Sequence, residues 1–183
     1  QINKNGETCG SWLRNDVNDD DGGSWEVLHL LNQGVWNTTN LERCPVTASA
    51  VKSLSGLMAG CIFGNAFISV LRPGTVIEPH CGPSNVRHRL HFALQIPRDD
   101  DDDEMMVVFQ AGERREQHKP SLTVAGVTQT WKEGECFVFD DSLTHSAVYP
   151  ALSSQSQGQP VYSPMAARVV LIVDLWHPEL TQL

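Results

Sequence analysis

From Asn65 onward the sequence consists of short apolar runs separated by glycine, proline and charged residues. Turn signals divide the runs at Arg72-Pro73-Gly74, at Gly126 and at Lys132-Glu133-Gly134. Many short strands with turns between them are typical of a β-sandwich or jelly roll, and not of a fold in which strands alternate with helices. The expected strands are Ala66–Leu71, His88–Ile96, Met105–Phe109, Leu122–Val124, Thr128–Trp131, Glu135–Phe139, Ser146–Tyr149 and Arg168–Leu175.

The first third of the chain has a different residue pattern. Residues 1–24 are rich in asparagine, aspartate and glycine, which predicts a loose leader. Trp25–Leu31 is apolar and is expected to form a strand, and Thr47 is expected to cap a short helix that runs to about Met58. We therefore expect one domain over residues 25–183, with an all-β core and a short N-terminal helical segment. Near its end, residues 153–164 are rich in serine, glutamine, glycine and proline and predict a flexible insertion.

The net charge of -9 is concentrated in two short runs. Asp19–Asp21 contributes three acids and Asp99–Glu104 contributes six, so 22 - 9 = 13 acids remain against 13 bases. The rest of the chain is therefore close to neutral, and the runs are expected to be solvated loops. Without a basic stripe, nucleic acid is not an expected partner.

No stretch of the sequence reaches the roughly 18 to 20 apolar residues that a membrane span needs. Because the chain opens with Gln1, we expect a mature form or a piece of a longer or anchored protein, and the compartment stays open. The cysteines are odd in number and include no CxxC pair, which argues against a zinc module or a disulfide scaffold. A single bridge such as Cys44–Cys61 remains open.

One expected strand carries an unusual polar face. Because side chains alternate along a strand, Arg87, Arg89, His91 and Gln95 share one side, while Leu90, Phe92, Leu94 and Ile96 share the other. Guanidinium groups are costly to bury unpaired. The polar face is therefore either solvent-exposed or the wall of a pocket that binds anions.

The last expected strand is apolar on both sides except at its ends. Arg168, Val170, Ile172 and Asp174 lie on one face. Such a pattern indicates a central strand, in which Arg168 needs a partner. A carboxylate is the natural one, because a guanidinium binds it through two parallel hydrogen bonds. That carboxylate belongs either to this chain or to a ligand.

Two of the seven histidines sit at expected strand ends. His80 lies in a turn after Pro79, and His145 follows the acidic turn Asp140-Asp141. Two histidines at strand edges fit opposite lips of a barrel mouth, although their spacing alone is a weak signal for a metal site.

Several blocks together resemble the aspartyl/asparaginyl β-hydroxylase family. They are Ser69-Val70-Leu71-Arg72-Pro73-Gly74-Thr75, then Pro79-His80-Cys81-Gly82-Pro83-Ser84-Asn85-Val86-Arg87-His88-Arg89-Leu90-His91, then Trp131-Lys132-Glu133-Gly134 with Phe139-Asp140-Asp141-Ser142-Leu143-Thr144-His145, and finally Val173-Asp174-Leu175-Trp176-His177-Pro178-Glu179-Leu180. The resemblance covers roughly residues 25 to 180 in the family's order. It implies a double-stranded β-helix, a cupin-like jelly roll, with iron(II) in its mouth.

The resemblance also implies a ligand set for the metal. His80 and His145 match the family's two histidine ligands, which leave positions for 2-oxoglutarate and dioxygen. Most oxygenases of the wider superfamily add a carboxylate two residues after the first histidine, where this chain has Gly82. The family is similar in lacking that carboxylate. Asp140 and Asp141 match its acidic pair and are expected to support the turn and the ligands.

The cosubstrate contacts follow from the same resemblance. Arg168 and Ser69 match the residues that bind the distal carboxylate of 2-oxoglutarate, and His91 matches a cosubstrate contact near the metal. Arg89 matches an active-site arginine, expected to bind a carboxylate of either substrate or cosubstrate. Arg87 is a weaker candidate for the substrate.

The expected reaction is oxidative decarboxylation of 2-oxoglutarate to succinate, coupled to hydroxylation of an unactivated C–H bond. The expected substrate bears a carboxylate or amide near the target carbon, as in an aspartyl or asparaginyl residue, a free amino acid or an acyl metabolite. Three alternatives remain: a halogenase with chloride at the position that Gly82 leaves vacant, a non-catalytic ligand-binding barrel, and a zinc hydrolase that uses His80, His91 and His145.

Overall fold

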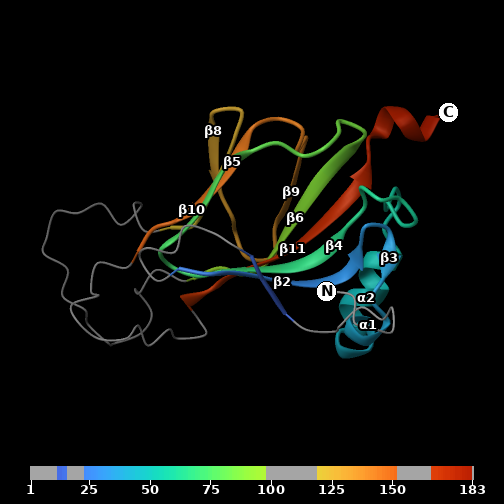
Figure 1. Ribbon diagram of the computed structural model, residues 1–183, viewed down its shortest axis with the longest axis horizontal. Helices are drawn as coiled ribbons and strands as arrows, with labels where there is room; N and C mark the ends of the chain where they lie inside the picture. The colour runs from blue at the N-terminus through green and yellow to red at the C-terminus, as the bar shows by residue number, and fades with distance from the viewer. Residues whose placement is uncertain (1–11, 16–22, 98–118, 152–165, 183) are drawn as a thin grey trace, which may run out of the picture.

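Two antiparallel β-sheets face each other and form the body of the molecule (Figure 1). The computed structural model describes residues 12–15, 23–97, 119–151 and 166–182. The larger sheet has the order β1 (Leu13–Asn15), β2 (Trp25–Asn32), β4 (Ala66–Leu71), β11 (Arg168–Trp176), β6 (Arg87–Gln95) and β9 (Cys136–Phe139), with β3 (Val35–Trp36) paired to β2. The smaller sheet has the order β5 (Thr75–His80), β10 (His145–Tyr149), β7 (Ser121–Val124) and β8 (Val127–Thr130).

The chain passes repeatedly from one sheet to the other. From β4 it crosses to β5, returns to β6, crosses to β7 and β8, returns to β9, crosses to β10 and ends in β11. This winding is that of a double-stranded β-helix, so the jelly roll expected from the spacing of the apolar runs is confirmed. Among the described helices none is long and apolar enough to span a membrane.

An apolar cluster packs against each face of the larger sheet. The cluster between the sheets consists of Val27, Phe67, Ala93, Leu122, Trp131, Ala147, Val170 and Ile172. The cluster on the outer face consists of Leu30, Leu31, Val51, Ala66, Leu171 and Val173. Strand β11 contributes to both clusters, as the alternation of its sequence predicts. Each fully buried aliphatic side chain contributes roughly 1.5 to 3 kcal/mol.

Two of the β-hairpins, β2–β3 and β7–β8, are closed by tight turns. Gln33 and Gly34, between β2 and β3, both have positive φ, at 50° and 80°. Ala125 and Gly126, between β7 and β8, have φ of 47° and 82°. Positive φ at both central residues is the mark of the type I′ turn, whose twist matches that of the flanking strands.

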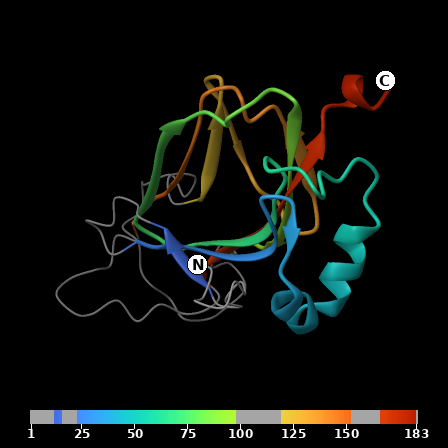
Figure 2. The same cartoon turned by 45° about the vertical axis from the view of Figure 1, so that its right-hand side comes forward.

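Two short helices pack outside the larger sheet (Figure 2), where Val51 joins the outer cluster. They are α1 (Thr38–Arg43) and α2 (Pro45–Lys52). The single helix expected from Thr47 to Met58 is therefore wrong in its bounds. Pro45 occupies the first turn of α2, where its missing N–H costs nothing. The Asn37 side chain caps α1 by accepting from the amide of Asn40 at 3.0 Å.

Other expectations differ from the structure in smaller ways. β1 pairs with β2, so the sheet includes three residues of the segment expected to be a loose leader. Cys44 and Cys61 are both free. Ile96 packs against the inner cluster and not with Leu90 on the outer face. Met105–Phe109, the acidic run at residues 99–104 and the insertion at residues 153–164 lie outside the described residues.

Candidate active site

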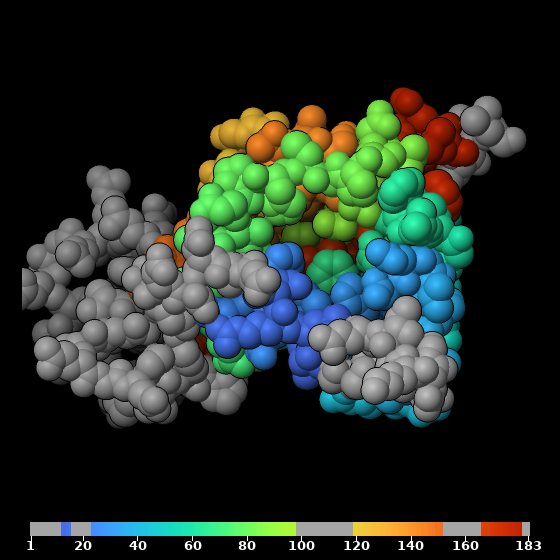
Figure 3. Space-filling model, in the orientation of Figure 1, coloured from blue at the N-terminus to red at the C-terminus, as the bar shows by residue number. Residues whose placement is uncertain are grey.

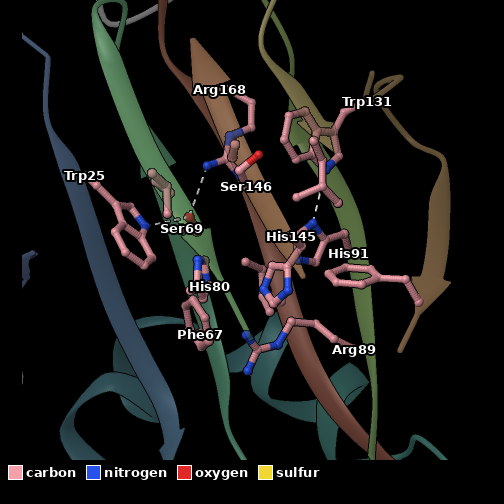
Figure 4. Close-up of a pocket in the computed structure, with 15 residues that line it drawn as sticks. Trp25, Phe67, Ser69, His80, Arg89, His91, Trp131, His145, Ser146 and Arg168 are labelled. Carbon is pink, nitrogen blue, oxygen red and sulfur yellow. Dashed lines mark hydrogen bonds between the residues drawn. The ribbon is translucent and has the colours of Figure 1, made fainter. Parts of the chain in front are cut away.

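A cavity of about 80 Å³ lies between the two sheets. It is lined by all six residues that the sequence nominated for the site: Ser69, His80, Arg89, His91, His145 and Arg168 (Figure 4). They come from β4, β5, β6, β10 and β11, so the winding of the chain brings together segments about 100 residues apart. The space-filling view shows a hollow between the green segment with β5 and the blue segment with β2 (Figure 3). Ile77 of β5 and Trp25 of β2 both line the cavity.

His80 and His145 are direct cross-strand neighbours. They face each other in the register of β5 and β10, and their ring centroids are 4.2 Å apart. His80 is exposed at the mouth, whereas His145 is only 5% exposed. The two histidines therefore lie on adjacent strands of one sheet, and the expectation that they occupy opposite lips of the barrel is wrong.

Both imidazoles are oriented by a backbone carbonyl two residues earlier. Nδ1 of His80 lies 2.8 Å from the oxygen of Glu78, and Nδ1 of His145 lies 2.8 Å from the oxygen of Leu143. A carbonyl only accepts, so each Nδ1 carries the proton and each Nε2 keeps its lone pair. This is the arrangement that orients metal-binding histidines in proteins. Burial, reinforced by the charge of His80, lowers the pKa of His145 and favours the neutral ring.

The histidine pair fits a metal that takes further ligands from outside the protein. Among the described residues, no cluster of three or more histidine, cysteine, aspartate or glutamate side chains is arranged to hold a metal ion. His91 is not a third ligand, because its Nδ1 accepts a hydrogen bond from Trp131 Nε1 at 3.2 Å, which places the ring proton on Nε2 and leaves no nitrogen lone pair for a metal. Two imidazoles leave several coordination positions for small molecules.

The position two residues after His80 is filled from another loop. A Cβ atom on Gly82 would lie 2.5 Å from Oδ2 of Asp141 and 2.7 Å from its Oδ1. Glycine is required here because the Asp141 carboxylate takes the space of a side chain. Asp141 is fully buried, and it binds arginines and not the histidines.

Those arginines form a buried ion network with Asp141 and Asp174. Arg87 contacts Asp141 at 2.5 Å and Asp174 at 3.2 Å, and it also donates to the oxygen of Phe63. Arg89 contacts Asp174 at 2.8 Å and Asp141 at 3.4 Å. The network therefore pairs two guanidinium cations with two carboxylate anions, and its net charge is zero. Arg87 is directed away from the cavity into this network, whereas Arg89 also lines the cavity.

Arg168 has a different environment from Arg87 and Arg89. Its side chain is 2% exposed, and in the described part of the chain no carboxylate pairs with it. Nη2 donates to Ser69 Oγ at 3.2 Å, the guanidinium lies 4.7 Å from the ring centroid of Trp131, and Nε has no partner. Burial lowers the pKa of Arg168 to about 9, so the group is still a cation at neutral pH. An unpaired buried cation with an unused donor is a site for an anion.

Ser69 adds a second donor beside Arg168. Its oxygen accepts from Trp25 Nε1 at 3.1 Å and from Arg168 Nη2 at 3.2 Å. With both lone pairs engaged, the hydroxyl proton is the one remaining function of Ser69. Ser146, which lies beside Arg168 in Figure 4, adds a hydroxyl that can donate or accept. This end of the cavity is therefore rich in donors, which suits a carboxylate.

Sequence reasoning did not assign roles to Trp25, Trp131 and Asp174. The indoles of Trp25 and Trp131 donate to Ser69 and His91, and Asp174 holds both arginines of β6. Asp174 could have been found from the sequence, since it shares a face of β11 with Arg168. Trp25 could not, because its contact depends on the pairing of β2 with β4.

The fold and the oriented histidine pair define a cupin-like double-stranded β-helix protein. A family model described as aspartyl/asparaginyl β-hydroxylase matches residues 1–178. The chain belongs to this family.

Curated relatives agree with the match. Human aspartate β-hydroxylase domain-containing protein 2 is 37% identical over 164 residues, which cover 90% of this chain and 36% of that protein. Mouse aspartyl/asparaginyl β-hydroxylase is 31% identical over 172 residues, which cover 94% of this chain and 19% of that protein. The chain thus spans about a third or less of these relatives. A solved structure described as a predicted oxalate decarboxylase from Thermotoga maritima aligns at 12% identity over 91% of this chain and 93% of that chain, with a TM-score of 0.45.

Proposed function

We propose that this protein is an iron(II)- and 2-oxoglutarate-dependent dioxygenase that hydroxylates an unactivated C–H bond. The observation that carries the proposal is the buried Arg168, which has no carboxylate partner among the described residues, in a cavity also lined by two histidines whose Nε2 atoms keep their lone pairs. The family and the names of the relatives support hydroxylation at the β-carbon of an aspartyl or asparaginyl residue, or of a related amino acid or acyl substrate.

Arg168 and Ser69 are proposed to bind the distal carboxylate of 2-oxoglutarate. The carboxylate would pair with the buried guanidinium and accept from the free Nε and from the Ser69 hydroxyl. Charge-assisted hydrogen bonds of this kind are about twice as strong as neutral ones. Burial of a guanidinium without a carboxylate is unfavourable, so a bound cosubstrate would offset the desolvation cost of Arg168.

His80 and His145 are proposed to hold iron(II). Bound there, the metal would supply the activation of dioxygen for insertion into the C–H bond. The protein's own part is to favour the neutral ring of His145, to orient both rings through Glu78 and Leu143, and to exclude water with the aromatic wall of Phe139 and Trp131.

Arg89 is proposed to contact the substrate and not the cosubstrate. In Figure 4, Arg168 and Arg89 lie on opposite sides of His80 and His145. If 2-oxoglutarate reaches the metal from Arg168, the Arg89 side remains for the substrate. Asp174 binds Nε and Nη2 of Arg89, and Asp141 lies 3.4 Å from Nη1, so one N–H on each of Nη1 and Nη2 remains to donate to a carboxylate or amide oxygen.

Halogenation is the less favoured outcome. Chloride would need the space beside Gly82, and the Asp141 carboxylate already lies within 2.7 Å of where a Cβ would be. A zinc hydrolase is also less favoured, since His91 is bound to Trp131. A non-catalytic ligand-binding barrel would account for an anion site at Arg168, but it gives no reason for two adjacent imidazoles that are oriented by the carbonyls of Glu78 and Leu143.

The test is succinate release from 2-oxoglutarate with iron(II), across peptides that contain aspartate or asparagine and across free amino acids. Mass spectrometry with labelled dioxygen, with and without chloride, identifies the product. We expect succinate together with a substrate heavier by one labelled oxygen atom in both buffers. A chlorinated product that requires chloride would replace hydroxylation by halogenation, and absence of succinate with every substrate would reject the proposal.

A further inference from the structure

Trp131 contacts two of the three residues that are assigned to the cosubstrate, His91 and Arg168. It follows β8, is 4% exposed and lines the cavity. Its indole nitrogen donates to Nδ1 of His91 at 3.2 Å, and its ring lies 4.7 Å from the Arg168 guanidinium. One side chain therefore holds two groups that come from different strands, β6 and β11.

The hydrogen bond to His91 has only one possible direction. Indole Nε1 is a donor and has no acceptor function, so Nδ1 of His91 must accept. A neutral imidazole that accepts through Nδ1 carries its proton on Nε2. Burial, aided by Arg168 and Arg89, keeps the pKa of His91 well below its ordinary value, so the ring is neutral.

The face of the same indole restrains Arg168. Within the described residues, Ser69 is the one hydrogen-bond partner of the guanidinium, through Nη2. The electron-rich ring of Trp131 attracts the cation at a distance within the roughly 6 Å of cation–π contacts. The ring thereby limits rotation of a side chain whose Nε has no partner.

We propose that Trp131 is a positioning residue that sets His91 as an Nε2–H donor and fixes the plane of Arg168, so that both present N–H groups to a dicarboxylate. With the other tautomer, His91 would direct a lone pair at an anion and repel it. That the bound anion is a dicarboxylate rests on the proposed function, whereas the predicted tautomer of His91 is independent of it.

The first test is the tautomer of His91 in the metal-free wild-type protein. Long-range nitrogen-15 NMR distinguishes the protonated from the unprotonated ring nitrogen, and His91→Gln assigns the signal by its loss. We expect the proton on Nε2. A proton on Nδ1 would overturn the proposal whether or not any turnover is observed.

The second test is Trp131→Phe, which keeps an aromatic ring beside Arg168 and removes the N–H donor. We expect signals of both His91 tautomers and a KM for 2-oxoglutarate raised roughly 3- to 10-fold, the effect of one lost hydrogen bond, with kcat changed much less. Trp36→Phe is the matched control, because Trp36 packs against the outer cluster and does not line the cavity. A Trp131→Phe protein with a single Nε2–H tautomer and an unchanged KM would contradict the role of the indole. If the wild type shows the expected tautomer but releases no succinate, the proposed function fails and the assignment of the His91 proton stands.

Discussion

The backbone amide of Gly82 donates to the carbonyl oxygen of Asp141 at 2.6 Å. This bond ties the turn after His80 to the turn before His145. The Asp141 side chain lies against the same glycine and binds Arg87 and Arg89. The two histidine-bearing turns are thus fixed to each other and to β6.

Gly82→Asp should not create a third metal ligand. The new side chain would collide with Asp141 and bring a second carboxylate beside a buried one, so we expect destabilisation of at least roughly 1 to 3 kcal/mol, the range for overpacking. Gly82→Ala should lose a similar amount for steric reasons alone. Urea unfolding measures the loss, and calorimetry with iron(II) under anaerobic conditions measures metal affinity. A Gly82→Asp protein of unchanged stability that binds iron more tightly would show that the space is open.

Removal of either histidine should abolish iron binding. His80→Ala and His145→Ala each delete one of two protein ligands, so the loss should exceed the roughly 10- to 100-fold that a missing supporting residue costs. His88→Ala and His177→Ala are controls, since that pair lies apart from the cavity with ring centroids 4.4 Å apart. Circular dichroism should show an intact fold in all four proteins. Tight iron binding by either cavity variant would exclude its histidine as a ligand.

Arg168→Ala should raise the concentration of 2-oxoglutarate required for turnover. The cosubstrate carboxylate would lose a buried charge-assisted partner worth roughly 2 to 4 kcal/mol. Substrate affinity should change far less, because Arg89 lies on the other side of the histidines. The thermal shift that 2-oxoglutarate produces in the wild type should disappear in this variant and persist in Arg43→Ala, a change on the exposed side of α1. An unaltered 2-oxoglutarate dependence would remove Arg168 from the cosubstrate site.

Asp174→Ala should unfold far more easily than a variant of an exposed ion pair. Arg87 and Arg89 would lose a fully buried partner, and the side chain and amide of Asn65 would lose theirs as well. Breaking a buried pair costs roughly 3 to 5 kcal/mol. Glu26→Ala, which breaks the half-exposed contact with Arg72 at 3.5 Å, should cost no more than about 1 kcal/mol. Equal midpoints in urea for the two variants would show that the network is not stabilising.

The sequence predicted the fold class well, because strand alternation is a local property. The apolar faces of β11 follow from a period of two and appear as expected, as does the polar face of β6 from Arg87 to His91. Beyond Ala93 the register with β11 shifts, and Ile96 packs against the inner cluster. Strand β5 was missed, since Pro79 interrupts its pattern. The structure accommodates this proline because β5 is an edge of the smaller sheet, where a missing N–H is tolerated.

The candidate site was predicted in its membership and not in its geometry. The resemblance named six residues that line one cavity, but it could not place His80 opposite His145, which depends on the register of strands distant in sequence. The partners of Arg89 were equally hidden, because Asp141 and Asp174 reach it from a different loop and a different strand. The bounds of α1 and α2 depend on a cap at Asn37 and a proline at position 45, both of which are local signals that could have been used.

Strand β11 carries Arg168 at one end and Asp174, which holds Arg89, near the other. They are six residue steps apart along an extended strand, or roughly 20 Å, and β4 and β6 pair with the strand on both sides. Neither end can shift without breaking two ladders of hydrogen bonds. Through Arg89 and Asp141 the strand is also tied to the turn before His145, which holds Arg168 at a fixed distance from the histidine pair. If Arg168 binds the distal carboxylate as proposed, the site should accept a five-carbon 2-oxo diacid and reject the homologue with one more methylene.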